Sequence, residues 1–110
     1  MKVYGYECGN KLLIEIDDAD VVLTLDEKVK KFVSISKYDK VNMNECKEVT
    51  INLDEVYSTK IYPRIYCSIY KIKFDNVEAY ILEQYDGADA TTKYTICDRQ
   101  DECERVMGEL

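Results

Sequence analysis

Residues 64–85 read RIYCSIYKIKFDNVEAYILEQY, two runs rich in Ile and Tyr on either side of the pair Asp75-Asn76. Asp and Asn tolerate the left-handed backbone of a tight turn, so we predict a hairpin here. A two-residue turn sets one register, in which Phe74 faces Val77, Ile72 faces Ala79, Tyr70 faces Ile81, Ile69 faces Leu82 and Lys73 faces Glu78. Apolar residues then meet apolar residues and opposite charges meet, as cross-strand pairing favours. Both faces are partly apolar, so we place this hairpin inside a sheet.

The segments on either side of this hairpin also carry strand patterns. Residues 2–8 and 11–17 flank Gly9-Asn10, a second two-residue turn signal, and the second run alternates apolar and polar residues. Shorter strands are predicted at 21–23, 49–53 and 93–97. The polar residues 37–47 are expected to connect two of them. Pro63 marks an interruption or an edge position, because proline has no amide hydrogen to donate.

Two segments favour helices. Thr24 and Glu27 match a capping box, and apolar residues at 25, 29, 32 and 33 follow at helical spacing, which predicts a helix over about 25–35. Residues 33–36 could equally belong to a strand. A second helix is predicted over about 99–108, where Cys103, Val106, Met107 and Leu110 form one apolar stripe.

These elements predict an α+β fold. We expect a mostly antiparallel sheet of about six to seven short strands, one internal helix and a C-terminal helix. A chain of 110 residues with 46% hydrophobic and 34% charged residues is expected to form a single domain over residues 1–110.

The formal charge of −7 disfavours direct binding to nucleic acid or to anionic membranes and favours protein partners with a basic surface. The N-terminus has no signal-peptide pattern, and no apolar run approaches the roughly 20 residues that span a bilayer. The five cysteines are an odd number, which fits a reducing compartment. We therefore expect a cytoplasmic protein that is a monomer or a homodimer.

The residue types that most enzymes need are missing or unorganised. The chain has no histidine, so the commonest general base and metal ligand are absent. The cysteines are not spaced as zinc ligands are, and Cys67, Cys97 and Cys103 lie in apolar patterns that predict core positions. Acid-x-Lys triplets of the kind that metal-dependent nucleases use occur at 26–28 and 45–47, outside the strand context they would need. We expect no catalytic residues, no metal and no cofactor.

Charge is segregated along the chain. Residues 7–27 hold seven acidic residues against one lysine. Acidic residues two apart on a strand lie about 6–7 Å apart on one face, so this segment could present a row of negative charge. The predicted partner-binding residues are Glu15, Asp17, Asp18, Asp20, Asp26 and Glu27. The lysines that follow, Lys28, Lys30 and Lys31, could form a second contact surface.

Ten tyrosines, with no Trp and two Phe, provide side chains that are enriched at protein interfaces. Small size, acidity and tyrosine content together favour a non-enzymatic acidic protein-binding module. We expect an inhibitor of the immunity, antitoxin or phage anti-defence type, which blocks a basic or nucleic-acid-binding surface of its partner. The alternative is a small ligand-binding or accessory domain that acts as a homo-oligomer.

Overall fold

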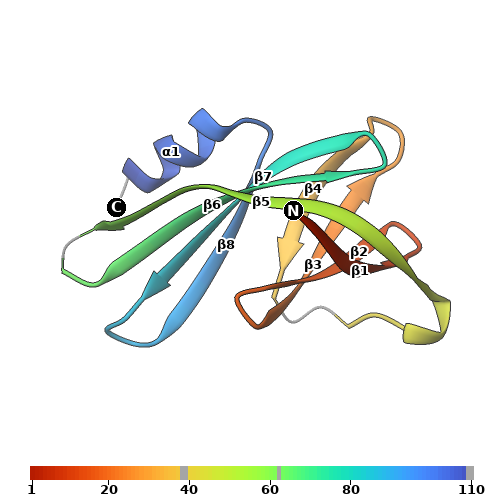
Figure 1. Cartoon of the computed structure of the whole chain (residues 1–110), viewed down its shortest axis with the longest axis horizontal. Helices are drawn as coiled ribbons and strands as arrows, with labels where there is room; N and C mark the ends of the chain where they lie inside the picture. The colour runs from red at the N-terminus through yellow and green to blue at the C-terminus, as the bar shows by residue number, and fades with distance from the viewer. Residues whose placement is uncertain (38–39, 62, 109–110) are drawn as a thin grey trace.

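The computed structural model describes residues 1–37, 40–61 and 63–108, and Tyr38, Asp39, Tyr62, Glu109 and Leu110 lie outside the described residues. Within the described residues the chain forms eight strands, one short 3-10 turn and one α-helix (Figure 1). In chain order they are β1 (Lys2–Cys8), β2 (Lys11–Ile16), β3 (Ala19–Asp26), β4 (Lys31–Ser36), η1 (Met43–Glu45), β5 (Cys46–Ile61), β6 (Ile65–Phe74), β7 (Val77–Asp86), β8 (Thr91–Cys97) and α1 (Gln100–Gly108).

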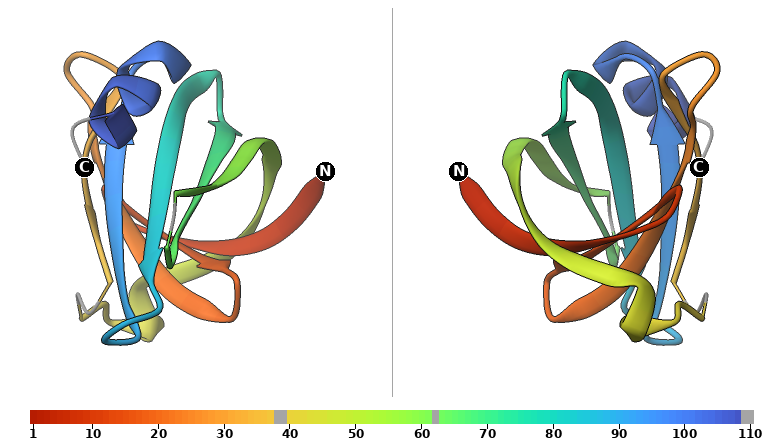
Figure 2. Two further views of the ribbon diagram at one scale, coloured as in Figure 1. Left: turned by 90° about the vertical axis from the view of Figure 1, so that its left-hand side faces the viewer. Right: turned by 90° about the vertical axis from the view of Figure 1, so that its right-hand side faces the viewer.

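All eight strands belong to one antiparallel sheet with the order β4-β3-β2-β1-β5-β6-β7-β8. Strands β1–β4 and β5–β8 are two meanders, and β1 pairs with β5 to join them. The sheet curls until its edge strands β4 and β8 pack against each other, so the fold is a nearly closed barrel (Figure 2). The ion pair between Lys31 and Asp98 spans this closure. Asp98 accepts a hydrogen bond from the lysine, which raises the pKa of Lys31.

The predicted α+β class, with six to seven strands and an internal helix, is therefore wrong. Residues 25–35 end β3, turn and begin β4, and this hairpin places Leu25 opposite Phe32. Phe32 is buried and Leu25 packs on the same core, whereas Val29 and Val33 are exposed. The helical spacing of these four residues was thus coincidental. Closing the barrel packs Leu25 and Phe32 against the core from the two strands of one hairpin. This packing stabilises the fold more than a weak local preference for helix would.

The predicted capping box of Thr24 and Glu27 begins no helix, and Asp26 between them closes a turn instead. Its carboxylate accepts hydrogen bonds from the backbone amides of Lys28 and Val29, at 2.9 and 3.4 Å. Lys30 follows with φ of 55°, in the left-handed region. An acidic residue that closes a turn through its own side chain carries the same sequence signal as a helix cap, because both motifs satisfy nearby amides.

The hairpin predictions are confirmed. Strands β6 and β7 pair in the expected register, with Asp75 and Asn76 at φ of 49° and 67°. Strands β1 and β2 pair around Gly9, whose φ is 63°. The strand predicted at 49–53 is much longer in the structure, because β5 continues to Ile61. A register shift between Glu55 and Tyr57 marks a bulge within it.

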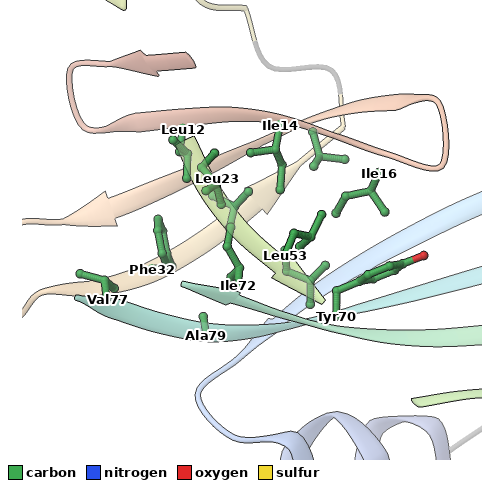
Figure 3. Close-up of a cluster of buried hydrophobic side chains, with 13 residues drawn as sticks. Leu12, Ile14, Ile16, Leu23, Phe32, Leu53, Tyr70, Ile72, Val77 and Ala79 are labelled. Atoms are coloured by element: carbon green, nitrogen blue, oxygen red, sulfur yellow. The ribbon is translucent and has the colours of Figure 1, made fainter. Parts of the chain in front are cut away.

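Two apolar clusters stabilise the fold. The larger one fills the barrel, and Figure 3 shows side chains from both meanders converging on it. The smaller one lies on the outer face of β6–β8, where α1 covers it. The predicted helix at 99–108 is confirmed as α1, which buries Cys103 and Met107. Among the described residues, no helix has the length and apolar character needed to cross a membrane.

The cysteines fall into two classes. Cys8 and Cys46 are opposite each other on β1 and β5 and form a disulfide, which differs from the expectation of reduced thiols. Cys67, Cys97 and Cys103 are free and buried, and the prediction that they are core residues is confirmed. Burial raises the pKa of the Cys67 and Cys103 thiols. These two thiols are therefore poor nucleophiles.

Candidate functional site

The acidic residues predicted to bind a partner fall into two groups at opposite ends of β3. Four lie at or beside the turn between β2 and β3, and two lie where β3 ends. Asp20 and Asp26 are six residues apart on this strand, or about 20 Å at roughly 3.3 Å per residue. The structure therefore brings together Glu15, Asp17, Asp18 and Asp20, and it separates Asp26 and Glu27 from them.

Glu15 and Asp20 lie directly opposite each other on β2 and β3. Both are exposed, because the alternate positions Ile14, Ile16 and Val21 point into the barrel and are buried. Asp18 is exposed in the turn between the two strands, where its φ is 65°. Like charges opposite each other in a sheet destabilise it. This end of the β2–β3 hairpin therefore carries a concentrated negative charge on the outside of the barrel.

Exposed tyrosines share this outer face. Tyr6 of β1 is opposite Leu13 of β2, two residues before Glu15, so Tyr6 and Glu15 point to the same side. Tyr4 lies two residues before Tyr6 and is 74% exposed. On the other side of β1, Tyr6 is opposite the exposed Glu48. We define the outer acidic face by these residues: Tyr4, Tyr6, Glu15, Asp18, Asp20 and Glu48.

Alternation also places two lysines on this surface, at the ends of the strands. Lys2 lies two residues before Tyr4, and Lys11 is opposite Cys8 and donates a hydrogen bond to the Thr24 hydroxyl. The face thus has an apolar and aromatic centre on β1 and a negative rim on β2, β3 and β5. This combination resembles the composition of protein interfaces, where tyrosines are enriched and charges gather at the rim.

Asp17 is exposed in the turn between β2 and β3, and its carboxylate contacts side chains at this end of the barrel. The Tyr70 hydroxyl donates a hydrogen bond of 3.1 Å to its Oδ2 atom. The side chains of Asp17 and Glu83 also share a hydrogen bond. Glu83 lies on β7, is only 8% exposed, and accepts a hydrogen bond of 3.0 Å from the Tyr94 hydroxyl. We call Asp17 and Glu83 the carboxyl pair.

Glu83 keeps its proton up to near neutral pH. Burial, followed by the hydrogen bond to Asp17, raises the pKa of Glu83 to about 7. Burial and the two nearby carboxylates also raise the pKa of Tyr70, so its hydroxyl stays protonated and acts as a donor. Ionisation of Glu83 would place a second negative charge beside Asp17, which disfavours the ionised form of Glu83. This contact ties the β2–β3 turn to β6 and β7.

Sequence reasoning missed Glu83 and the contacts of Asp17 with Tyr70 and Glu83. A signal was present, because Glu83 follows Ile81 by two residues in a strand whose neighbours are apolar, so alternation puts it on an inward face. Nothing in the sequence identified the partner of Glu83. The hydrogen bond joins two segments that lie far apart along the chain, and only the curl of the sheet brings them together.

Lys28, Lys30 and Lys31 lie in the turn that joins β3 and β4 and at the start of β4. Lys31 forms an ion pair with Asp98. Lys28 and Lys30 are exposed at the end of the barrel opposite the carboxyl pair. Lys30 and Glu27 line a surface depression of about 400 Å3, together with Glu7 and the β6–β7 turn. Three acidic side chains, Glu7, Glu27 and Asp75, and one lysine thus line this opening, so negative charge dominates it.

Three surface depressions, of about 450, 400 and 430 Å3, are open to solvent. In the described ranges 1–37, 40–61 and 63–108, no group of three or more acidic, cysteine or histidine side chains is placed to hold a metal ion. Comparison of the chain with protein-family models, with curated proteins and with solved structures finds no match.

Proposed function

We propose that this protein is a non-enzymatic binding module whose outer acidic face binds a basic surface of a partner protein. The observation that carries the proposal is the exposed pair of Glu15 and Asp20, directly opposite each other and on the same face as Tyr4 and Tyr6. By occupying the basic surface, the protein would act as an inhibitor of whatever normally binds there.

A like-charge pair directly across two strands lowers stability by a few tenths of a kcal/mol up to about 1 kcal/mol. A basic partner turns the same repulsion into attraction, because lysine or arginine side chains placed between the two carboxylates neutralise both. The charge also accelerates association by steering the partner towards the face.

The tyrosines supply the part of the interface that excludes water. Tyr4 and Tyr6 have large apolar rings and a hydroxyl that can donate or accept, and they lie beside the negative rim. Tyrosine is among the residues that most often dominate binding energy in interfaces. Salt would weaken the charged part of the contact and leave the aromatic part largely intact.

The ligand-binding alternative fits the geometry less well. Small-molecule sites are concave and enclose most of the ligand, with a few convergent polar groups. The depressions described above lie open at the surface, and charged side chains line them. Convergent polar groups occur at the carboxyl pair, but these groups hydrogen-bond to one another.

The test is a matched pair of charge reversals, Asp20→Lys and Glu104→Lys. Both residues are exposed, and each substitution changes the net charge equally, but Glu104 lies on α1, away from the outer acidic face. Wild type and both variants are immobilised in parallel and used to capture proteins from the native host. The affinity of any protein that wild type retains is then measured directly over a series of salt concentrations.

Asp20→Lys should weaken binding about tenfold or more, because a like charge across an interface costs about a kcal/mol or more. It should also stabilise the folded protein slightly, since the introduced lysine would face Glu15. Glu104→Lys should bind as wild type does. Equal binding by Asp20→Lys and wild type, or equal loss in both variants, would contradict the proposal.

A further inference from the structure

Strand β5 has an edge that is only half covered. It spans 16 residues, and β1 pairs with it from Cys46 to Asn52. Residues 54–61 pair with β6 on one side, and no described strand pairs with them on the other. At roughly 3.3 Å per residue this uncovered edge is about 26 Å long.

The other edges of the sheet are covered by a neighbouring strand, and this edge of β5 is not. Strands β4 and β8 are the formal edges of the sheet, and they pack against each other to close the barrel. Along the uncovered part of β5, Val56 and Tyr57 are 39% and 40% exposed. An exposed edge of this length, with apolar side chains, is a template for another strand.

The bulge in β5 decides which side chains a second strand would meet. Glu55 is opposite Tyr70 and Lys60 is opposite Tyr66 on β6. Tyr66 and Tyr70 are four residues apart on a regular strand, so they point to the same face, and Glu55 and Lys60 must do so as well. Without the bulge, residues five apart would point to opposite faces. The Lys60 Nζ atom lies 5.2 Å from the centre of the Tyr66 ring, which keeps its side chain on that face.

We propose that two copies of this chain pair through the uncovered edge of β5, antiparallel about a two-fold axis at Ser58. In this register, with the bulge residue Val56 left unpaired, Glu55 of each copy faces Lys60 of the other, so the pairing forms two equivalent ion pairs. Tyr57 then faces Thr59 across the axis. A closed two-fold contact of this kind is self-complementary and stops at the dimer.

A lysine and a bulge commonly protect an edge against foreign strands. Here Lys60 and the bulge at Val56 still permit pairing with one kind of strand. That strand must place a carboxylate opposite Lys60. The chain itself meets that requirement. The contact is independent of the outer acidic face, so each proposal can fail without the other.

The test is a charge swap that is measured by the oligomeric state. Sedimentation equilibrium or light scattering over a range of protein concentrations is applied to wild type, Glu55→Lys, Lys60→Glu and the double variant. Each single variant replaces both ion pairs by repulsion and should raise the dimer dissociation constant about tenfold or more. The double variant restores both ion pairs with exchanged partners and should return the constant to near the wild-type value.

Circular dichroism and unfolding midpoints of the four proteins check that each is folded. A wild type that stays monomeric at the highest concentration would overturn the proposal. So would single variants that dimerise as well as wild type, or a double variant that is as weak as the singles. If wild type is monomeric yet an extended peptide binds this edge, the occupant is a foreign strand and the self-pairing proposal is wrong.

Discussion

The carboxyl pair makes the stability of this protein depend on pH, and Glu83→Gln should remove that dependence. Glutamine has nearly the same shape as glutamic acid and is always neutral. It can still accept the hydrogen bond of the Tyr94 hydroxyl and can donate one to Asp17. The substitution therefore mimics the protonated state of Glu83 at every pH.

The magnitude follows from the pKa of Glu83, which the fold raises from an ordinary 4.5 to about 7. Between these values the folded state binds more protons than the unfolded state, so stability falls as pH rises through this window. Each pH unit corresponds to about 1.4 kcal/mol, which sets an upper limit of about 3 kcal/mol on the loss at pH 8. Below pH 4.5 the loss is absent.

Urea unfolding at several pH values between 4 and 8 measures this effect. Wild type should lose up to about 3 kcal/mol over the window, and Glu83→Gln should lose much less and be more stable than wild type at pH 8. The matched control is Glu78→Gln on the same strand, because Glu78 is exposed and lies about 4 Å from two lysines. Parallel curves for wild type and Glu83→Gln would refute the raised pKa of Glu83.

Two further predictions concern the packing of β1. The Cys8–Cys46 disulfide joins residues 38 apart, so reductant should lower the free energy of unfolding by about 4 kcal/mol. Cys8→Ser should show this loss without reductant. If reductant left the free energy of unfolding of wild type unchanged, the cross-link would be disproved. Gly5→Ala should lower stability by about 1–3 kcal/mol, because its Cβ would lie 2.5 Å from Ile51 Cδ1. Gly108 has open space around it, so Gly108→Ala is the control, and equal midpoints would contradict the packing at Gly5.

Local turn chemistry explains why the hairpins could be predicted. Asp75-Asn76 and Gly9 adopt the left-handed backbone that their residue types favour, and the two-residue turns then fix every pair that follows. A register of this kind depends only on neighbours in the sequence. The same holds for α1, a helix of nine residues whose apolar side chains Cys103 and Met107 need one face to pack on.

The prediction of an internal helix was wrong because two local sequence signals were ambiguous. Asp26 and its neighbours match a cap and a turn equally well, and apolar residues at 25 and 32 serve either a helix stripe or a hairpin pair. Strand β5 was underestimated for a related reason. Its second half has exposed residues on both faces, so no alternation marked it.

The amino-acid order by itself determined the hairpins, the C-terminal helix and the acidic character of residues 7–27, because these follow from neighbouring residues. Only the tertiary structure decided which carboxylates act together. Glu15 lies opposite Asp20 because of the local two-residue turn between β2 and β3, but the curl of the sheet brings Asp17 to Glu83. It also leaves half of β5 without a neighbouring strand among the described residues. These are contacts between distant segments, and their geometry depends on how the whole barrel closes.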